Sequence, residues 1–571
     1  MIKSENWQAL NLLQERYREQ VKCIYIDPPY NTKKDDFLYK DNYKSSSWLS
    51  MVCDRIHVAK DFLKKDGVFF SSIDRNEVSK YQIALSDVFG AENAIGEIVW
   101  RNARDNNPTQ IAIEHEYIVC LAKDITSTDS VWKNKCADSK ELLLNEYHRL
   151  KNKNLTLGQI QKRIRDFIRD NKTILGEVDR YKFVDENGIY TGSQSVHNPH
   201  PGGYEYEIPH PVTKKPMNIP ANGYRFPFNT LKQDYIDKDR IIYGPDENRI
   251  IQIKLYLEDY QDSLRSVIDL DGRLGIYALN ALFGNNTNVF TNPKPPQLIE
   301  RLISFGTAPE TVILDFFAGS GTTVHSVLEM ARNNDTSPKY LAIDLSDYII
   351  QIAIPRVKKI AYSSNWKDGN PQDTDGQSHI FKYMVLEQYE DTLDNIEFLD
   401  KDGQLQQTLF SMSDYMLRYF LDVETRESPC RLNVDRLATP FAYSLRVRRD
   451  VGFDHVPVDE DGFREVTADL VETFNYLLGL HVRRRVARHR GDLTYRIVHG
   501  VLPDGKVATI VWRNSPKKPE DHQEELKEDA AFITESILGE FPNTATLYVN
   551  GHCFAPQAVP IEPEFKKLMG A

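Results

Sequence analysis

Cysteine is scarce in this sequence and is never spaced for a metal site. The chain of 571 residues has six cysteines, with no CxxC pair and no Cys/His spacing of the kind that binds zinc. Zinc sites need such spacing, and disulfide frameworks belong mainly to small secreted chains. We therefore expect reduced thiols, no metal site and a cytoplasmic protein.

Long apolar runs and a positive net charge are also missing. No stretch approaches the roughly 18 apolar residues of a membrane span, and the start, MIKSENWQAL, lacks the apolar run of a secretory signal. The net charge of −12 argues against indiscriminate binding to polyanions. Basic residues nevertheless gather in 148–172 and in HVRRRVARHR (481–490). We interpret both as solvated helix faces, and the first also as a phosphate-binding surface if the rest of the chain requires one.

Helical and strand patterns alternate over residues 1–129. A helical pattern over residues 48–67 predicts an amphipathic helix closed by Gly67. Four segments have the composition of strands: KCIYID (22–27), GVFFSSID (67–74), EIVWRN (97–102) and EYIVCLAK (116–123). This order predicts an α/β fold with a mostly parallel sheet.

The α/β pattern breaks at about residue 130 and resumes near residue 276. Residues 130–275 hold basic helical segments and then a stretch dense in Pro, Gly, Asn and Tyr, which predicts an inserted module. The α/β pattern continues over 276–378. After a polar linker, residues 379–571 are expected to form a separate C-terminal α/β or α+β domain.

The segment CIYIDPPYNT (23–32) runs from a strand directly into an acid, two prolines and a tyrosine. Proline cannot donate to a strand ladder or continue as a helix, so the chain must turn sharply at Pro28 and Pro29. The turn places Asp27 as a hydrogen-bond acceptor and Tyr30 as an aromatic plate. A planar substrate that carries hydrogen-bond donors would suit this pair.

A second motif, ILDFFAGSGTT (313–323), is an apolar strand followed by glycines at a turn that opens a helix. The absence of GK[ST] excludes a Walker loop. Val324, where a third glycine would stand, weakens a nicotinamide site. An S-adenosylmethionine site and a tight turn without a ligand both remain. Asp344 ends the next strand, about where a Rossmann-like fold places the acid that holds a ribose.

The two motifs become more specific as a pair. Ligands of doubly wound sheets bind at the carboxyl ends of the strands. If the strands that carry Asp27 and Gly319 are neighbours, both loops face one crevice. Together, the motifs resemble those of the amino-methyltransferases of DNA, in which DPPY is usual for adenine-N6 members. The order, with DPPY first, is that of the β group, which implies a Rossmann-like doubly wound methyltransferase sheet with a circularly permuted motif order.

The resemblance extends over roughly residues 1–400. Segments similar to the modification (Mod) subunits of type III restriction–modification systems are SSIDRNE, EHEYIVCLAK, NGYRFP, NPKPPQLIERLI, DFFAGSGTT and LEQYEDTLDNI. Such proteins normally carry considerable sequence ahead of the first motif, so an N-terminal segment is expected to be missing. Asp344 stands where Glu is more frequent, which keeps the carboxylate but shortens its reach.

The resemblance implies site-specific transfer of a methyl group from S-adenosylmethionine to N6 of a flipped adenine. The catalytic residues would be Asp27, Pro28, Pro29 and Tyr30. Asp27 and the Pro28 carbonyl would accept hydrogen bonds from the amino group, and Tyr30 would stack on the base. Segment His115–Tyr117 matches a wall of the base pocket, although Tyr117 is equally expected in the core.

The resemblance also implies a cofactor set. Phe316, Gly319 and Gly321 would surround the methionine portion, and Asp344 would accept from the ribose hydroxyls. Lys294 and Pro295 would belong to a segment that closes over the cofactor. Asp315 would contact the cofactor amine or simply finish the strand.

The domains receive roles on the same basis. Residues 1–129 would be the catalytic half of the methyltransferase domain, 276–378 its cofactor-binding half and 130–275 the target-recognition region. Residues 379–571 would dimerise, dock a partner or contact DNA. The implied partners are double-stranded DNA, a second copy of the chain and a restriction (helicase–nuclease) subunit. N4-cytosine methylation and a catalytically silent specificity subunit remain alternatives.

Overall fold

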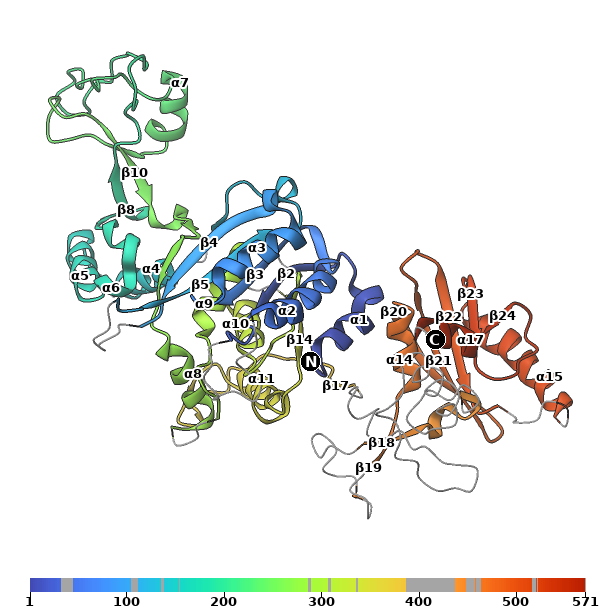
Figure 1. The fold of residues 1–571 in the computed structure, drawn as a ribbon. Helices are drawn as coiled ribbons and strands as arrows, with labels where there is room; N and C mark the ends of the chain where they lie inside the picture. The colour runs from blue at the N-terminus through green and yellow to red at the C-terminus, as the bar shows by residue number, and fades with distance from the viewer. Residues whose placement is uncertain are drawn as a thin grey trace. The chain divides into compact units, whose positions relative to one another are not determined.

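The computed structural model describes most of the chain in two compact units. The described residues are 1–31, 45–103, 111–134, 138–153, 155–285, 289–306, 310–334, 337–386, 437–447, 457–458, 464–515, 520 and 522–569. One unit holds residues 1–130 and 265–571, and the other holds residues 131–264 (Figure 1). All but the first residue of the segment LEQYEDTLDNI lies outside the described residues, as does Thr32 of DPPYNT.

A nine-stranded sheet forms the centre of the first unit, in the order β12-β4-β5-β3-β2-β13-β14-β1-β17. The strands are Val267–Asp269 (β12), Ala94–Arg101 (β4), His115–Ala122 (β5), Leu63–Ile73 (β3), Val21–Ile26 (β2), Val312–Asp315 (β13), Lys339–Asp344 (β14), Ile2–Lys3 (β1) and Met384–Val385 (β17). Only β5 runs antiparallel to its neighbours among these strands. The predicted mostly parallel, doubly wound sheet is therefore confirmed.

The two motif-bearing strands are neighbours. β13 pairs with β2 in parallel, with Ile313 opposite Cys23 and Leu314 opposite Ile24. Both strands are buried, as expected for central strands of a parallel sheet that is covered on both faces. Their carboxyl ends therefore meet at the same edge of the sheet.

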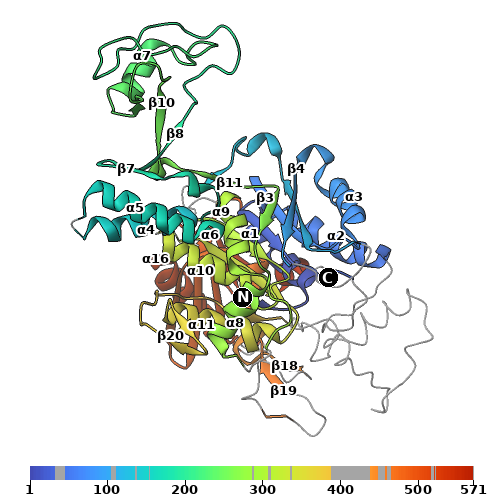
Figure 2. The same cartoon turned by 90° about the vertical axis from the view of Figure 1, so that its left-hand side faces the viewer.

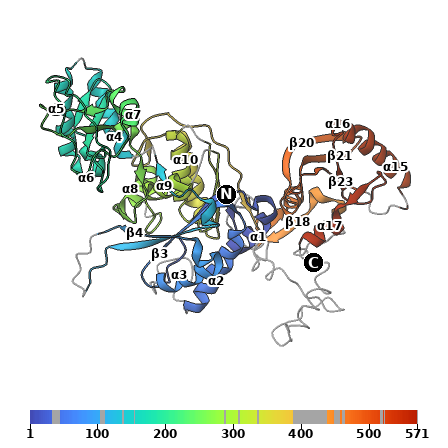
Figure 3. The same cartoon turned by 90° about the horizontal axis from the view of Figure 1, so that it is seen from above.

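Helices cover both faces of this sheet, as the views in Figures 1 and 3 show. Helices α1 (Asn6–Tyr17), α2 (Ser45–Lys60) and α3 (Val78–Phe89) pack into one apolar core against one face. On the other side lie α8 (Arg273–Phe283), α9 (Pro296–Gly306), α10 (Thr322–Asn334) and α11 (Ile354–Tyr362). None of the described helices is long and apolar enough to cross a membrane.

The predicted helix over 48–67 is wrong at its end. Helix α2 stops at Lys60, and Phe62 and Leu63 are fully buried where β3 begins. The pairing of β2 with β3 passes from Val21–Leu63 directly to Cys23–Val68, so Gly67 lies within an irregular strand. The burial of two large apolar side chains overrides the helical pattern.

The second unit contains two small apolar cores. Its main elements are α4 (Asp138–Lys151), α5 (Leu157–Asp170), α6 (Lys172–Leu175), α7 (Phe228–Leu231), and a sheet of β7 (Phe183–Asp185), β8 (Gly188–Ser193), β10 (Gln252–Tyr256) and β9 (Ile241–Ile242). A short pair, β6 (Lys133–Asn134) and β11 (Asp262–Ser263), also belongs to this unit. Figure 2 shows β8 and β10 running from the helices α4–α6 to the part that carries α7. Helix α5 buries Ile160, Ile164 and Ile168 in one core, so its basic residues lie on the opposite, exposed face.

The C-terminal part of the chain has its own five-stranded sheet, in the order β20-β21-β22-β23-β24. The strands are His481–Arg490, Leu493–Val501, Val507–Arg513, Thr546–Val549 and Ala558–Pro560, in that order. One core forms with α14 (Leu470–Leu477) and α17 (Ile561–Leu568), and another with α15 (Gln523–Ala531) and the turns after it (Figure 3). A separate short pair is β18 (Ser444–Val447) with β19 (Arg464–Thr467).

Residues 481–490 are an edge strand, and the predicted helix face is wrong there. The segment is β20, which pairs along its length with β21. Arg485, Arg488 and Arg490 form ion pairs with Glu472, Glu540 and Glu528. Charged side chains on an exposed edge strand disfavour pairing with other chains.

Candidate active site

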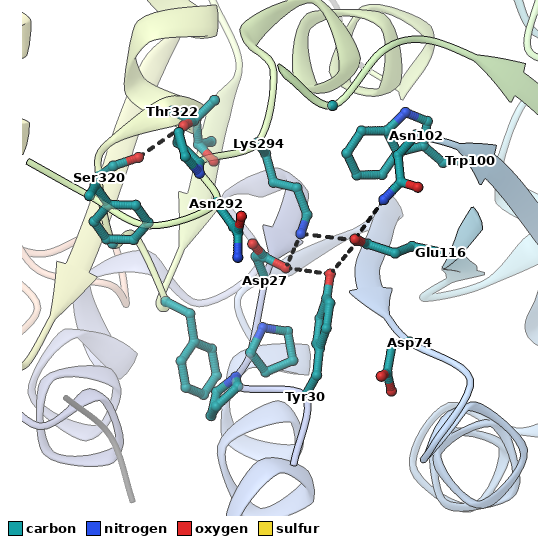
Figure 4. A pocket seen from close by; sticks show the side chains of 18 of the residues that line it. Asp27, Tyr30, Asp74, Trp100, Asn102, Glu116, Asn292, Lys294, Ser320 and Thr322 are labelled. Carbon is teal, nitrogen blue, oxygen red and sulfur yellow. Dashed lines mark hydrogen bonds and ion pairs between the residues drawn. The ribbon is translucent and has the colours of Figure 1, made fainter. Parts of the chain in front are cut away.

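A cavity of about 610 Å³ opens at the carboxyl ends of β2 and β13. The DPPY loop lines it with Asp27 and Tyr30, and the glycine loop lines it with Gly319. Asp344, at the end of β14, lines it as well. The expected convergence of these two loops on one crevice is therefore confirmed. Figure 4 shows the side chains that point into this cavity.

The DPPY loop is fixed from behind by hydrogen bonds. The fully buried Trp48 of α2 donates from Nε1 to the Pro29 carbonyl at 2.7 Å. Asn31 has a φ of +57° and donates from Nδ2 to Glu77 at 2.9 Å. Asparagine tolerates this left-handed conformation better than most residues. The loop is thus held on both sides of Tyr30, at Pro29 and at Asn31, which sets the position of this ring beside Asp27.

Asp27 belongs to a compact ionic cluster (Figure 4). The Tyr30 hydroxyl lies 2.8 Å from Asp27 Oδ1 and 3.0 Å from Glu116 Oε2, so the two carboxylates share its one proton. Lys294 Nζ lies 3.1 Å from the same two oxygens. Asn102 donates to the other oxygen of Glu116 at 2.8 Å. Two carboxylates therefore share one phenol and one ammonium group.

Burial and charge act on the protonation of this cluster in opposite directions. Burial raises the pKa of Asp27, and the Glu116 carboxylate adds to the rise, while Lys294 and Tyr30 oppose it. Burial lowers the pKa of Lys294, but attraction to Asp27 and Glu116 outweighs it, so the net pKa is raised. Burial and both carboxylates raise the pKa of Tyr30, which keeps the phenol protonated as a donor.

The glycine loop is shaped by its backbone. Gly319 has a φ of +48° and donates from its amide to Asp344 Oδ2 at 2.7 Å. Gly321 has a φ of +76°, and a Cβ atom there would come within 2.9 Å of the Ala353 side chain. Gly319 therefore forms part of the cavity wall, whereas the lack of a side chain at Gly321 lets the loop pack closely against Ala353 behind it.

Asp315 ends β13 as a buried carboxyl group that lines the cavity. The Phe317 amide donates to it at 3.0 Å, and the Thr323 hydroxyl donates to its other oxygen. Burial nevertheless raises the pKa of Asp315 from 3.8 to about 7, with the Asp27 and Asp344 charges adding to the rise.

This raised pKa gives Asp315 a predicted signature in stability. In the unfolded chain Asp315 ionises near pH 3.8, whereas in the folded chain it stays protonated until about pH 7. The contribution of this group to the free energy of unfolding is therefore fully present below about pH 3.8. As the pH rises from there to about 7, that free energy falls by up to about 4 kcal/mol.

We expect Asp315→Asn, which cannot ionise, to raise the midpoint of thermal unfolding relative to the native chain at about pH 8 but not at about pH 4. Thermal unfolding of both proteins across this range measures the difference. An equal difference at both ends would show that ionisation of Asp315 is not its cause.

The structure brings most of the predicted site residues to the cavity. Those that line it are Asp27, Pro28, Pro29, Tyr30, Lys294, Asp315, Gly319 and Asp344. Gly321 and Pro295 lie outside the lining. The Phe316 ring is fully buried in the core beside α1 and α2, and the neighbouring Phe317 lines the cavity, so the place of Phe316 around the methionine portion stays a prediction. The Lys294 ammonium group contacts Asp27 and Glu116, and its place in a segment that closes over the cofactor stays a prediction.

Several lining residues were not predicted as site residues. Among them are Trp100 and Asn102 at the end of β4, Asp74 after β3, and Phe290, Asn292 and Tyr348. The position of Trp100, Asn102 and Asp74 at strand ends was a usable signal, because the sheet edge that carries DPPY collects the ends of parallel neighbours. The sequence predicts Glu116 only as part of a wall of the base pocket. No pattern in the sequence indicates that it pairs with Lys294.

A family model described as DNA methylase matches residues 21–355, which is more than half of the chain. The chain belongs to the DNA methylase family. The match runs from the first residue of β2 into α11, so it includes both loops of the cavity as well as the second unit between them.

Relatives of this chain include Mod subunits of type III restriction–modification enzymes. The EcoP15I Mod subunit of Escherichia coli is 41% identical over 377 residues, covering 61% of this chain and 58% of that protein. The StyLTI Mod subunit of Salmonella typhimurium is 25% identical over 470 residues, covering 71% and 64%. The type II methyltransferase M.KpnI of Klebsiella pneumoniae is 25% identical over 379 residues, covering 64% and 83%. The resemblance to Mod subunits is confirmed, and the chain spans less than two thirds of either Mod subunit.

Proposed function

We propose that this chain transfers a methyl group from S-adenosylmethionine to N6 of adenine in DNA, as the modification component of a restriction–modification system. The observation that carries the proposal is the single cavity lined by both Asp27 and Gly319. A donor on the glycine loop and a base on the DPPY loop would be adjacent there. The names of the Mod relatives support the restriction–modification context.

The residues of the glycine side fit this cofactor. The Phe290 and Tyr348 rings, 4.8 Å apart in an edge arrangement, line the cavity beside Gly319 and offer apolar contact to an adenine ring. A Cβ atom on Gly319 would come within 3.2 Å of Phe290, so the absence of a side chain keeps this part open. The Asp344 and Asp315 carboxyl groups supply acceptors for hydroxyl and amino groups. When bound, the cofactor supplies an electrophilic methyl group on a sulfonium centre.

The DPPY side would prepare the amino group as a nucleophile. An adenine amino group is a poor nucleophile because its lone pair is delocalised into the ring. Asp27 and the Pro28 carbonyl would each accept a hydrogen bond from one of its N–H groups and turn its lone pair toward the methyl group. Fixed acceptors of this kind lower a barrier because they need no reorganisation during the reaction. The nitrogen then gives up a proton, and the raised pKa of Asp27 suits that carboxylate to receive it.

The base must leave the double helix to reach this cavity. Flipping costs a few kcal/mol, and stacking on an aromatic ring such as Tyr30 returns about 1–3 kcal/mol. Residues 130–275 are proposed to contact double-stranded DNA, with basic residues of α5 at phosphates. We also propose that the chain forms a homodimer and binds a separate helicase–nuclease subunit. Residues 379–571 would supply contacts for this assembly.

Methylation of mixed-sequence DNA tests the proposal. The full chain is incubated with labelled S-adenosylmethionine and double-stranded plasmid DNA, and the DNA is digested to nucleosides. We expect labelled N6-methyladenine, because an acid precedes the two prolines at positions 28 and 29. Labelled N4-methylcytosine would favour the cytosine alternative, and absence of label would favour the silent specificity subunit.

A further inference from the structure

The Lys294 side chain lies where the proposed function needs space for a base. Its ammonium nitrogen is 4.8 Å from the centre of the Tyr30 ring and 5.6 Å from the centre of the Trp100 ring. Tyr30 also packs against the apolar core, so the side of the ring that meets Lys294 is the side open to the cavity. We call the space over Tyr30 beside Trp100 the base slot (Figure 4).

Lys294 also uses the acceptor that the target amino group would use. Asp27 Oδ1 already receives the Tyr30 hydroxyl and the Lys294 ammonium group. A carboxylate oxygen has two lone pairs, so these donors fill it. An incoming amino group that uses this oxygen must therefore replace one of them. Tyr30 is fixed within the loop, whereas the ammonium group is carried on a flexible four-carbon stem.

The backbone that carries Lys294 is held in place, which limits any movement to the side chain. A Cβ atom on Gly275 of α8 would come within 1.9 Å of the Pro293 carbonyl, so the loop before α9 packs directly on that helix. Only about a tenth of the Lys294 side chain is exposed. A buried cation that loses one partner needs another nearby, because an unpaired buried charge is costly.

Glu116 is placed to keep Lys294 paired. Its Oε2 atom lies 3.1 Å from Lys294 Nζ, and Asn102 and Tyr30 fix its two oxygens. We propose, on the basis of the proposed function, that Lys294 occupies the base slot before a base enters, and that entry moves its ammonium group from Asp27 onto Glu116 alone. Lys294 and Glu116 are then positioning residues that set the cost of base entry.

A double-variant cycle tests this arrangement. Glu116→Gln keeps the size of the side chain but removes the charge that receives Lys294, so Lys294 stays on Asp27. We expect the KM for plasmid DNA to rise about tenfold, the value of one hydrogen bond to a charged group. Lys294→Met removes the competitor and is expected to lower that KM. The double variant is expected to return to the KM of Lys294→Met, and so to be rescued relative to Glu116→Gln.

The matched control is Lys294→Arg, which keeps a cation in the slot and should retain the KM increase when combined with Glu116→Gln. Cofactor affinity measured by calorimetry shows that each variant is folded at the glycine loop. If the double variant has a KM at or above that of Glu116→Gln while the native chain forms N6-methyladenine, the displacement of Lys294 is wrong and the proposed function stands. If the native chain methylates no DNA, both proposals are wrong.

Discussion

Replacing Asp27 by alanine is expected to slow methyl transfer by about 10³-fold, the upper range for loss of one preorganised polar contact at a reacting group. The carboxylate is the only acceptor in the DPPY motif that also carries charge, and Tyr30 and Lys294 hold it in place. Without it, the amino group loses the acceptor that turns its lone pair out of the ring and that receives its proton. Single-turnover rates with labelled cofactor and plasmid DNA measure the loss.

The same variant should leave the cofactor affinity nearly unchanged. The glycine loop is held by Asp344 and by residues behind it, whereas the polar contacts described for Asp27 are with Tyr30 and Lys294. Asp74→Ala is the matched control, because Asp74 is an acid that lines the same cavity but is hydrogen-bonded to Asn76, outside the cluster. We expect a much smaller loss from it. An Asp27→Ala variant that keeps a tenth or more of the native rate would contradict the assigned role.

The sequence was informative wherever a local motif determines a backbone shape. The prolines after Asp27 and the glycines after β13 each require a turn at a strand end, so both loops were predictable, and the α/β pattern predicted that their strands share a sheet. The orientation of side chains beyond the strand was not predictable in this way. β13 ends at Asp315, and beyond a strand end the alternation of side chains no longer predicts that Phe317 lines the cavity.

Contacts between distant segments were not predictable in the same way. Lys294 and Glu116 lie in different halves of the chain, and their pairing depends on the packing of the Pro293 carbonyl against Gly275. The prediction for the segment 481–490 was wrong for a different reason. Its repeated arginines suggested a solvated helix, but pairing with β21 and ion pairs to three glutamates fix it as a strand. In this second case tertiary context overrides local propensity.

Arg356 is the second residue for which we expect a large effect, although it does not line the cavity. It is fully buried on α11 behind the glycine loop. Its Nη1 atom donates to the Ser320 carbonyl at 3.1 Å and to the Thr322 hydroxyl at 3.1 Å, and its Nη2 atom lies 2.9 Å from His325 Nδ1. Because arginine only donates, His325 Nδ1 must accept, so its Nε2 atom carries the proton toward Glu329 at 2.9 Å.

Burial lowers the pKa of His325, which keeps the ring neutral in this role. The guanidinium group thus joins the loop, the first turn of α10 and the His325–Glu329 pair in one network. Residues that share such a network act together, so removing the central one leaves several buried polar groups without a partner.

Arg356→Met is therefore expected to destabilise the methylase domain by about 3–5 kcal/mol, the cost of breaking a buried charged network. We also expect S-adenosylmethionine affinity to fall by at least about tenfold, because Gly319 is bonded directly to Ser320, whose carbonyl Arg356 holds in place. Arg356→Lys keeps the charge but not the planar fork, so it should retain more stability than Arg356→Met while still losing cofactor affinity.

Arg332→Met is the control: Arg332 lies on α10 and donates to the Ile360 carbonyl, away from the glycine loop. Thermal unfolding and calorimetry measure the two quantities. Equal loss of cofactor affinity in Arg332→Met and Arg356→Met would show that general stability, and not the hold on Ser320 and Thr322, shapes the glycine loop.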